Sequence, residues 1–439
     1  MMNMTVREAA FDAYLKIMDE KAYSNIVIDE VLSSGEVSPK DSGLFTGLIY
    51  GTLSRQLTLE FYLQPFLRTK VKKWHRHLLN MAAYQMVYLD RVPAYAVINE
   101  TVEIAKEYGG RQAANVTNAI LRNFMREPLR EITEIKYPQK RLSVETSIPL
   151  WIIRHWETHY KAEGAEKIAR SLAANPEMYI RVNTRYTDAE SLKEKLDMEG
   201  HPVELTELHP DALVVSSGAS IMNTGAYMDG DFSVQDVSSM FVNTALDPRD
   251  GDVILDACSA PGGKGLHALE KNPGGHVDLS DVYDHKVRTI ERNAKRLKLD
   301  NYDAFKGDAT KHEYPRMYDK IIVDAPCSGL GVIKRKPEIR YERNSADIDS
   351  LVDLQIEILD HVKKFLKPGG TLIYATCTIH QMENENVAYT FVKSNDNFKF
   401  EDFHIPALDF TGPHRQILPY ELNTDGFFIA RFKKDVLND

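Results

Sequence analysis

Apolar residues in the first third of the chain recur with the period of an α-helix. A helical face at the start is made by Val6, Ala9, Ala10, Ala13, Tyr14 and Ile17. Ser38-Pro39 predicts a further helix start, because Ser caps helices and Pro fits their first position. A helix opening at Pro93 is predicted to end at Gly109-Gly110, and residues 113–125 form the last one. Residues 1–135 are therefore predicted to be an all-α domain. Within it, Gly43, Gly47 and Gly51 predict a stripe of close helix packing.

The pattern changes over the next hundred residues. Residues 136–150 are polar and contain Pro138 and Pro149, so they are predicted to be a linker. A helix at 151–160 and a capping box at Thr187-Asp188-Ala189-Glu190 accompany three short apolar runs, at 178–183, 203–205 and 212–215. This order predicts a small, RRM-like α+β subdomain over residues 151–235, for which we expect RNA binding.

Residues 236–439 alternate short apolar runs with helical segments. The apolar runs lie at 253–255, 276–279, 304–305, 321–323 and 371–374. Such alternation favours a doubly wound parallel sheet. The predicted fold class is thus multidomain, with an all-α part, a small α+β part and an α/β Rossmann-like domain.

Composition places the chain among ordinary globular proteins, with 43% hydrophobic and 27% charged residues. No apolar run approaches the ~18 residues of a membrane span, and charges interrupt the first apolar stretch, unlike a secretory signal. The three cysteines lack zinc-ligand spacing, so no metal is expected and a reducing cytoplasm is predicted.

Charge is unevenly distributed along the chain. The net charge is -10, yet residues 1–140 carry 18 Lys and Arg against 16 Asp and Glu. A local basic run comprises Lys70, Lys72, Lys73, His75, Arg76 and His77. This run is either a phosphate-binding patch or a solvated helix start.

A glycine-rich turn and a series of acids follow the predicted parallel strands. Residues 256–264 read Asp-Ala-Cys-Ser-Ala-Pro-Gly-Gly-Lys after the first strand, and Asp281 and Asp308 follow the next two. Glycines let backbone approach a ligand, and an acid after the second strand suits ribose hydroxyls. Because strands of an open α/β sheet bind ligands at their carboxyl ends, these groups predict one cofactor crevice. A dinucleotide and S-adenosylmethionine both fit it.

Two thiols decide between these cofactors. Cys327 lies in Asp324-Ala325-Pro326-Cys327 and Cys377 in Thr376-Cys377-Thr378, each directly after a predicted strand. Hydride transfer needs no thiol, so an oxidoreductase leaves both without a task. Methylation of cytosine C5 needs one, because a thiolate that adds to C6 makes C5 nucleophilic. A non-catalytic RNA-binding scaffold needs neither thiol.

Two resemblances support this interpretation. The segments 6–10, 41–53, 97–102 and 118–122 resemble the NusB-like RNA-binding domain. The motifs around Cys258, Cys327 and Cys377, with Asp425-Gly426-Phe427-Phe428, resemble the RNA cytosine-5 methyltransferases of the Sun/Nop2 family. Joined together, the two parts are similar to bacterial enzymes that methylate 16S ribosomal RNA. The implied C-terminal part, residues 236–439, is a class I methyltransferase domain.

The family resemblance implies roles for individual residues. Cys377 is the implied nucleophile, Cys327 assists product release and Asp324 holds N3 of the base. The implied S-adenosylmethionine contacts are Cys258, Ser259, Ala260, Pro261, Gly262, Gly263, Lys264, Asp281, Asp308 and Asp324. Thr378 stands where many members have Ser.

Candidate RNA contacts complete the prediction. A basic segment after Cys327 and one arginine of the small subdomain suit phosphate and a stacked base: Lys334, Arg335, Lys336, Arg340 and Arg181. We expect 16S ribosomal RNA as the partner, with no membrane and no obligate protein partner. A tRNA substrate remains an alternative.

Overall fold

The computed structural model describes residues 4–68, 70–216 and 221–436, which form two compact units. Unit 1 comprises Met1–Ala174 and Ile333–Arg343, whereas unit 2 comprises Asn175–Val332 and Asn344–Asp439. Each unit contains its own hydrophobic core. None of the helices in the described ranges is long and apolar enough to cross a bilayer.

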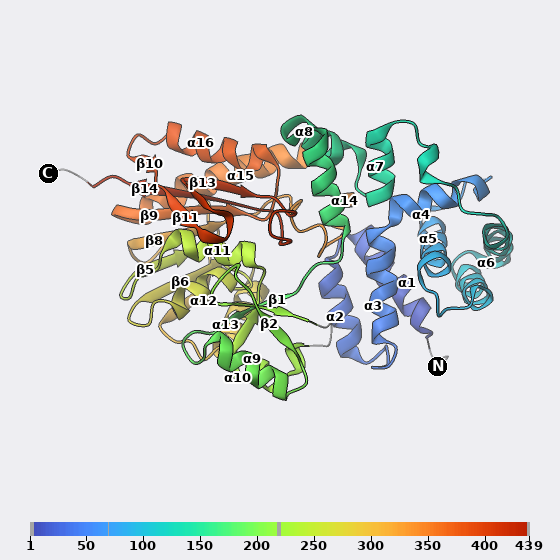
Figure 1. Ribbon diagram of the computed structural model, residues 1–439, viewed down its shortest axis with the longest axis horizontal. Coiled ribbons are helices and arrows are strands. Elements are labelled where there is room, and N and C mark those ends of the chain that lie inside the picture. Colours follow the sequence, from blue (N-terminus) through green and yellow to red (C-terminus); the bar gives the residue numbers. More distant parts are fainter. Residues whose placement is uncertain (1–3, 69, 217–220, 437–439) are drawn as a thin grey trace. The chain divides into compact units, whose positions relative to one another are not determined.

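Unit 1 is helical (Figure 1). Its elements are α1 (Val6–Glu20), α2 (Ser24–Ser34), α3 (Ser42–Ser54), α4 (Gln56–Leu63), η1 (Gln64–Phe66), α5 (Lys73–Tyr88), α6 (Ala94–Arg126), η2 (Ile132–Glu134), α7 (Pro138–Thr146), α8 (Leu150–Ala173) and α14 (Ile339–Glu342). A capping box between Thr5 and Glu8 starts α1. The predicted apolar face of α1 is confirmed, since five of its six members are fully buried.

The region around α3 differs from its prediction in two ways. The helix begins at Ser42, because Ser38 closes a turn in which its hydroxyl donates to Asp41 Oδ2 over 2.7 Å. Of the three glycines predicted to allow close helix packing, only Gly51 does so, since a Cβ there would lie 2.0 Å from Cζ of Tyr84 on α5. A Cβ at Gly43 or Gly47 would meet nothing within 4 Å. Close packing is therefore confined to one position.

Two other predictions concern helix ends. The helices predicted on either side of Gly110 are present within α6, whose backbone is non-helical at that residue (φ 71°). The segment 136–150, predicted to be a linker, is helical for most of its length, because it contains α7 and the start of α8. Pro138 is the first residue of α7, where the missing N–H costs no hydrogen bond. The helix predicted at 151–160 runs on, past a break at Lys161, to Ala173.

A small antiparallel sheet begins unit 2, in the order β2-β3-β1-β4. Its elements are β1 (Tyr179–Val182), α9 (Ala189–Met198), β2 (Val203–Leu205), β3 (Ala212–Val215), η3 (Ile221–Asn223), α10 (Gly225–Asp229) and β4 (Phe232–Val234). The three predicted strands are confirmed. Asp188, rather than Thr187, caps α9 by accepting from Ser191 N over 2.8 Å.

The large sheet of unit 2 has the order β10-β14-β9-β8-β5-β6-β7, with β13 beside β14. Its strands are β5 (Val253–Asp256), β6 (His276–Asp281), β7 (Tyr302–Lys306), β8 (Tyr318–Asp324), β9 (Leu366–Thr376), β10 (Phe398–Phe400), β13 (His414–Ile417) and β14 (Phe427–Lys434). Strands β5 to β9 pair in parallel, and β14 is antiparallel to β9. A separate hairpin pairs β11 (Phe403–Ile405) with β12 (Phe410–Gly412). The predicted doubly wound sheet is confirmed.

Helices cover both faces of this sheet (Figure 1). One core holds α11 (Val237–Leu246), α12 (Gly263–Glu270) and α13 (Asp284–Arg296), and the other holds α15 (Ser345–Val362) and α16 (Glu385–Lys393). Neighbouring strand residues alternate between the cores, as Ile254 and Leu255 do on β5. Short 3-10 turns complete the unit, namely η4 (Lys363–Phe365), η5 (Gln381–Glu383) and η6 (Pro406–Leu408).

The glycine pair on α3 gives a stability test. Gly51→Ala should lower the free energy of unfolding by about 1–3 kcal/mol, because the methyl group overlaps the Tyr84 ring. Gly47→Ala, on the same helix, should raise it by up to ~1 kcal/mol through helix propensity alone. Chemical denaturation of both variants measures this. Equal effects at the two positions would show that close packing at Gly51 is unimportant.

Candidate active site

The candidate site lies at the carboxyl ends of the parallel strands. Asp256 ends β5, Asp281 ends β6 and Asp324 ends β8, while Cys377 directly follows β9. The chain order reverses between the adjacent strands β5 and β8, which is where ligands bind in open α/β sheets. The topology therefore brings the predicted acids and one thiol to a single edge.

The glycine-rich turn connects β5 to α12. Gly262 has φ +101°, a conformation that side chains rarely adopt. Ser259 N donates to Ser280 O of β6 over 2.8 Å, which holds the turn against the neighbouring strand. Gly265 is tightly enclosed, since a Cβ there would lie 2.9 Å from Asp256 Oδ2. The backbone N–H groups at the start of α12 lie at the strand ends, a setting suited to a polar ligand.

The acids at the strand ends differ in environment. Asp281 is 6% exposed, and Lys286 Nζ lies 3.5 Å from its carboxylate. Hydrogen bonds from Thr310 and Lys311 lower the pKa of Asp308 to about 2, so it is ionised at neutral pH. Burial, together with repulsion from Asp324, raises the pKa of Asp256 to about 7. Asp256 thus belongs to the core beneath the crevice, a role that the sequence did not indicate.

The two predicted catalytic thiols are in contact. Cys327 Sγ and Cys377 Sγ are 3.2 Å apart, because they follow adjacent parallel strands in which Asp324 pairs with Ala375. The hydrogen bond with Cys377, burial and the charge of that neighbour raise the pKa of Cys327. Two thiols this close share at most one negative charge.

The third thiol has a different character. Burial raises the pKa of Cys258 well above its ordinary value, and the nearby carboxylates Asp256, Asp281 and Asp324 add to the shift. Cys258 also packs against the core beneath α15 and α16. This environment keeps the thiol neutral and suits packing and backbone contact better than nucleophilic attack.

Lys264 has a partner that the sequence did not reveal. Its ammonium lies 2.5 Å from Asp324 Oδ2 and 5.2 Å from the ring centre of Phe427. Burial lowers the pKa of Lys264, but attraction to Asp324 and to Cys377 outweighs burial and raises it overall. Lys264 therefore stays protonated and joins the cofactor turn to the proposed catalytic acid.

Glu383 is a second residue that sequence reasoning missed. It is fully buried on η5 and accepts from Ser328 N over 2.7 Å and from Ser328 Oγ over 2.5 Å. The Ser328 hydroxyl also lies 2.8 Å from that of Thr378. The segments behind Cys327 and Cys377 are thus tied together through their next residues. Spacing in the sequence did not single out Glu383, because Ser328 lies 55 residues away in the chain.

The terminal motif closes the site from a fourth segment. Gly331 N donates to Cys377 O over 3.1 Å, and Gly426 N donates to Gly331 O over 2.9 Å. A Cβ at Gly331 would lie 1.9 Å from Gly426 O, so only glycine fits there. A Cβ at Gly426 would in turn lie 2.6 Å from Ile379 Cγ2 and 3.0 Å from Gly331 Cα, which explains why a glycine precedes Phe427 in the sequence motif.

Three predicted RNA contacts are buried, one of which is Lys334, at 7% exposed. Arg181 and Arg340 are each 1% exposed, and both donate to protein acceptors. The placement of these two side chains contradicts direct contact with RNA, because hydrogen bonds within the protein already engage them. Lys334, Arg335 and Lys336 belong with Arg340 to unit 1, where Lys336 Nζ lies 5.1 Å from the Tyr23 ring centre.

Comparisons with known proteins agree with this architecture. Three family models match the chain, described as NusB family (residues 4–126), RsmF/B-like methyltransferase ferredoxin-like domain (148–222) and 16S rRNA methyltransferase RsmB/F (243–433). The crystal structure of PH0851 has a TM-score of 0.84 and covers 98% of both chains at 23% identity, which supports the fold. A methyltransferase homolog from Pyrococcus horikoshii is 26% identical over 68% of this chain and 99% of its own, with a TM-score of 0.59.

Full-length relatives give the family. A probable ribosomal RNA small subunit methyltransferase B from Bacillus subtilis is 39% identical over 99% of this chain and 100% of its own length. The Serratia proteamaculans ribosomal RNA small subunit methyltransferase B is 31% identical over 98% and 99%. The fold and site thus define a class I methyltransferase with a NusB-like domain and a ferredoxin-like subdomain. More specifically, the chain belongs to the ribosomal RNA small subunit methyltransferase B family.

The buried Asp256 carboxyl predicts a pH dependence of stability. Its pKa is raised to about 7, so the folded state favours the protonated form. Stability should fall as pH rises from about 4, the ordinary pKa of Asp, to about 7, by at most ~1.4 kcal/mol per pH unit. Asp256→Asn cannot lose a proton at this position. The difference in melting temperature, variant minus wild type, should therefore grow as pH rises through that window. Exposed Asp349→Asn is the control. A constant difference for Asp256→Asn would refute the raised pKa.

Proposed function

We propose that this protein transfers a methyl group from S-adenosylmethionine to C5 of a cytosine in 16S ribosomal RNA, in the cytoplasm. The observation that carries the proposal is the pair of thiols 3.2 Å apart, beside Asp324 and the cofactor turn. The names of the full-length relatives support ribosomal RNA of the small subunit as substrate.

The strand ends fit the proposed cofactor. The tight turn at Gly262, the start of α12 and the carboxylates of Asp281 and Asp308 supply donors and acceptors for a nucleoside with an amino acid tail. The NSun6 structure from Pyrococcus horikoshii with SFG shares the fold, with a TM-score of 0.59 and 24% identity. When bound, S-adenosylmethionine supplies an electrophilic methyl group.

Cys377 starts the reaction by adding its thiolate to C6 of the cytosine. The new S–C6 bond moves electrons toward N3 and makes C5 nucleophilic. Asp324 and the protonated Lys264, 2.5 Å apart, provide a carboxylate and a proton donor where this charge gathers. The target base must leave its stack to reach Cys377.

Cys327 acts in the second half. While Cys377 is ionised, its charge opposes ionisation of Cys327. The S–C6 bond removes that charge, so ionising Cys327 costs less once the adduct exists, while burial and the charges of Glu383 and Asp324 still raise its pKa. C5 first takes the methyl group as the methyl–sulfonium bond breaks. The Cys327 thiolate then accepts the C5 proton, the electrons of the C–H bond reform the C5–C6 double bond, and Cys377 leaves as thiolate. The contact between the two thiols thus lets Cys377 ionise first and Cys327 only after the adduct has formed.

The thiol roles are tested by two single variants. Cys377→Ala should form no adduct and no product, because the attacking sulfur is gone. Cys327→Ala should accumulate a covalent protein–RNA complex, because the bond forms but C5 keeps its proton. Denaturing gel electrophoresis with 16S RNA and S-adenosylmethionine distinguishes them, with Cys258→Ala as the matched thiol control. RNA trapped by Cys377→Ala instead would reverse the two assignments.

Cofactor binding through Asp281 is tested by calorimetry. Asp281→Ala should weaken S-adenosylmethionine binding by at least about tenfold, since a charged hydrogen bond is worth ~1.5–3 kcal/mol. Asp284→Ala, an exposed acid at the start of α13 that pairs with Lys306, should leave affinity unchanged. Unchanged affinity in Asp281→Ala would remove this residue from the cofactor site.

A further inference from the structure

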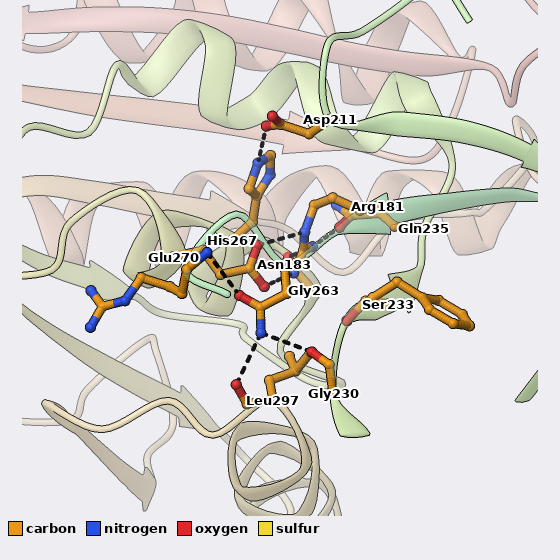
Figure 2. Close-up of polar contacts among 12 residues, drawn as sticks. Arg181, Asn183, Asp211, Gly230, Ser233, Gln235, Gly263, His267, Glu270 and Leu297 are labelled. Carbon is orange, nitrogen blue, oxygen red and sulfur yellow. Dashed lines mark hydrogen bonds and ion pairs between the residues drawn. The ribbon is translucent and has the colours of Figure 1, made fainter. Parts of the chain in front are cut away.

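Arg181 is a buried cation on β1, one of the two inner strands of the small sheet. Its side chain is entirely shielded from solvent, and its guanidinium donates to both carboxylate oxygens of Glu270 over 3.1 and 2.6 Å. It also donates to Gln235 Oε1 and, over 2.8 Å, to Gly263 O (Figure 2). Arg181 thus has three acceptor residues. Gln235 belongs to the small subdomain, whereas Gly263 and Glu270 lie beyond it.

The acceptors beyond the subdomain lie at opposite ends of one helix. Gly263 is the first residue of α12 and Glu270 the last. Gly263 also belongs to the glycine-rich turn, and the next residue, Lys264, contacts Asp324. The guanidinium therefore connects the small subdomain to the segment that carries both the cofactor turn and the lysine of the catalytic pair.

Neighbouring contacts hold the same region. Asp211, which precedes β3, lies 3.5 Å from His267 Nε2 and 2.6 Å from Lys271 Nζ, on and just after α12. Asn183, two residues from Arg181 and so on the same face of the strand, donates to Gly230 O and to Leu297 O at the end of α13 (Figure 2). The small subdomain thus contacts both helices that follow the cofactor strands.

The cost of burying an ion pair limits what Arg181 contributes to stability. Removing two charges from water roughly cancels their attraction, so such a pair is often replaceable by neutral groups without loss of stability. The contact with Gly263 O is different, because it fixes the backbone of the turn itself. This hydrogen bond therefore contributes to the position of the turn more than to the stability of the fold.

We propose that Arg181 is a positioning residue, which holds α12 and its glycine-rich turn in the geometry that binds S-adenosylmethionine and places Lys264 against Asp324. This inference rests on the proposed cofactor. It assigns to the small subdomain a task in cofactor binding in addition to the expected RNA contact.

The experiment separates positioning from stability with a paired substitution in the full-length protein. Arg181→Gln alone leaves Glu270 as a lone buried charge, so its melting temperature should fall. Arg181→Gln with Glu270→Gln removes both charges and should recover most of that loss. The double variant should still bind S-adenosylmethionine at least about tenfold more weakly than wild type, with RNA affinity within about twofold. In activity assays the KM for S-adenosylmethionine should rise while the KM for RNA is unchanged.

Two further variants sharpen the comparison. Arg181→Lys keeps a cation beside Glu270 but lacks the fork that also reaches Gly263, so it should fold and bind S-adenosylmethionine weakly. Lys195→Gln removes a cation paired with Asp229 and Asp231 within the small subdomain, away from α12, and should leave cofactor affinity unchanged.

The outcomes distinguish the inference from the function on which it rests. Double-variant and Arg181→Lys proteins that bind S-adenosylmethionine within about twofold of wild type overturn the positioning role. Weakened RNA binding with unchanged cofactor affinity also overturns it, because Arg181 would then support RNA binding and not the cofactor turn. Wild-type protein that binds no S-adenosylmethionine overturns the proposed cofactor itself.

Discussion

The parallel register of β8 with β9 is the constraint on which the site depends. Because Asp324 pairs with Ala375, the residues after the two strands leave the sheet side by side, and Cys327 meets Cys377. A shift of one residue would turn alternate side chains to the opposite face and separate the thiols. Beyond the end of the hydrogen-bonding ladder, the hydroxyls of Ser328 and Thr378 are hydrogen-bonded to each other. Ser328 also donates to Glu383, and these contacts secure the register.

The cation nearest the thiols and Asp324 is Lys264. Lys264 is surrounded by Asp324, Asp256 and Cys377, and its attraction to them overcomes its own desolvation. The acids respond differently, because Asp324 holds the lysine at 2.5 Å whereas Asp256 is fully buried and repelled by Asp324. Because the pKa of Asp256 is raised to about 7, its carboxyl is protonated below that pH, and Lys264 then has Asp324 as its charged partner. The same cation favours a thiolate on Cys377.

The sequence was sufficient for features that depend on local pattern. Apolar runs ending in Asp256, Asp281 and Asp324 located the strands, and strand ends of a parallel sheet necessarily meet. It failed for Arg181 and Arg340, because their acceptors lie far away in the chain and only the fold brings them near. Pro138 misled for a local reason, since proline both interrupts and starts helices. The contact between Lys264 and Asp324 was equally invisible to spacing.

The segment Ile333–Arg343 shows why sequence order and structural unit differ. It follows the Cys327 motif in the chain, yet it belongs to unit 1, and two of its buried polar residues have partners there. Glu338 is fully buried and accepts from both the amide and the hydroxyl of Ser24, over 3.0 and 2.9 Å. Arg340 donates to the carbonyls of Ser54 and Ser147. Buried donors and acceptors without partners are costly, so the first 174 residues alone would lose structure that this segment completes. The basic residues around Arg340, predicted from composition to bind RNA, thus include one whose role is to complete the helical unit.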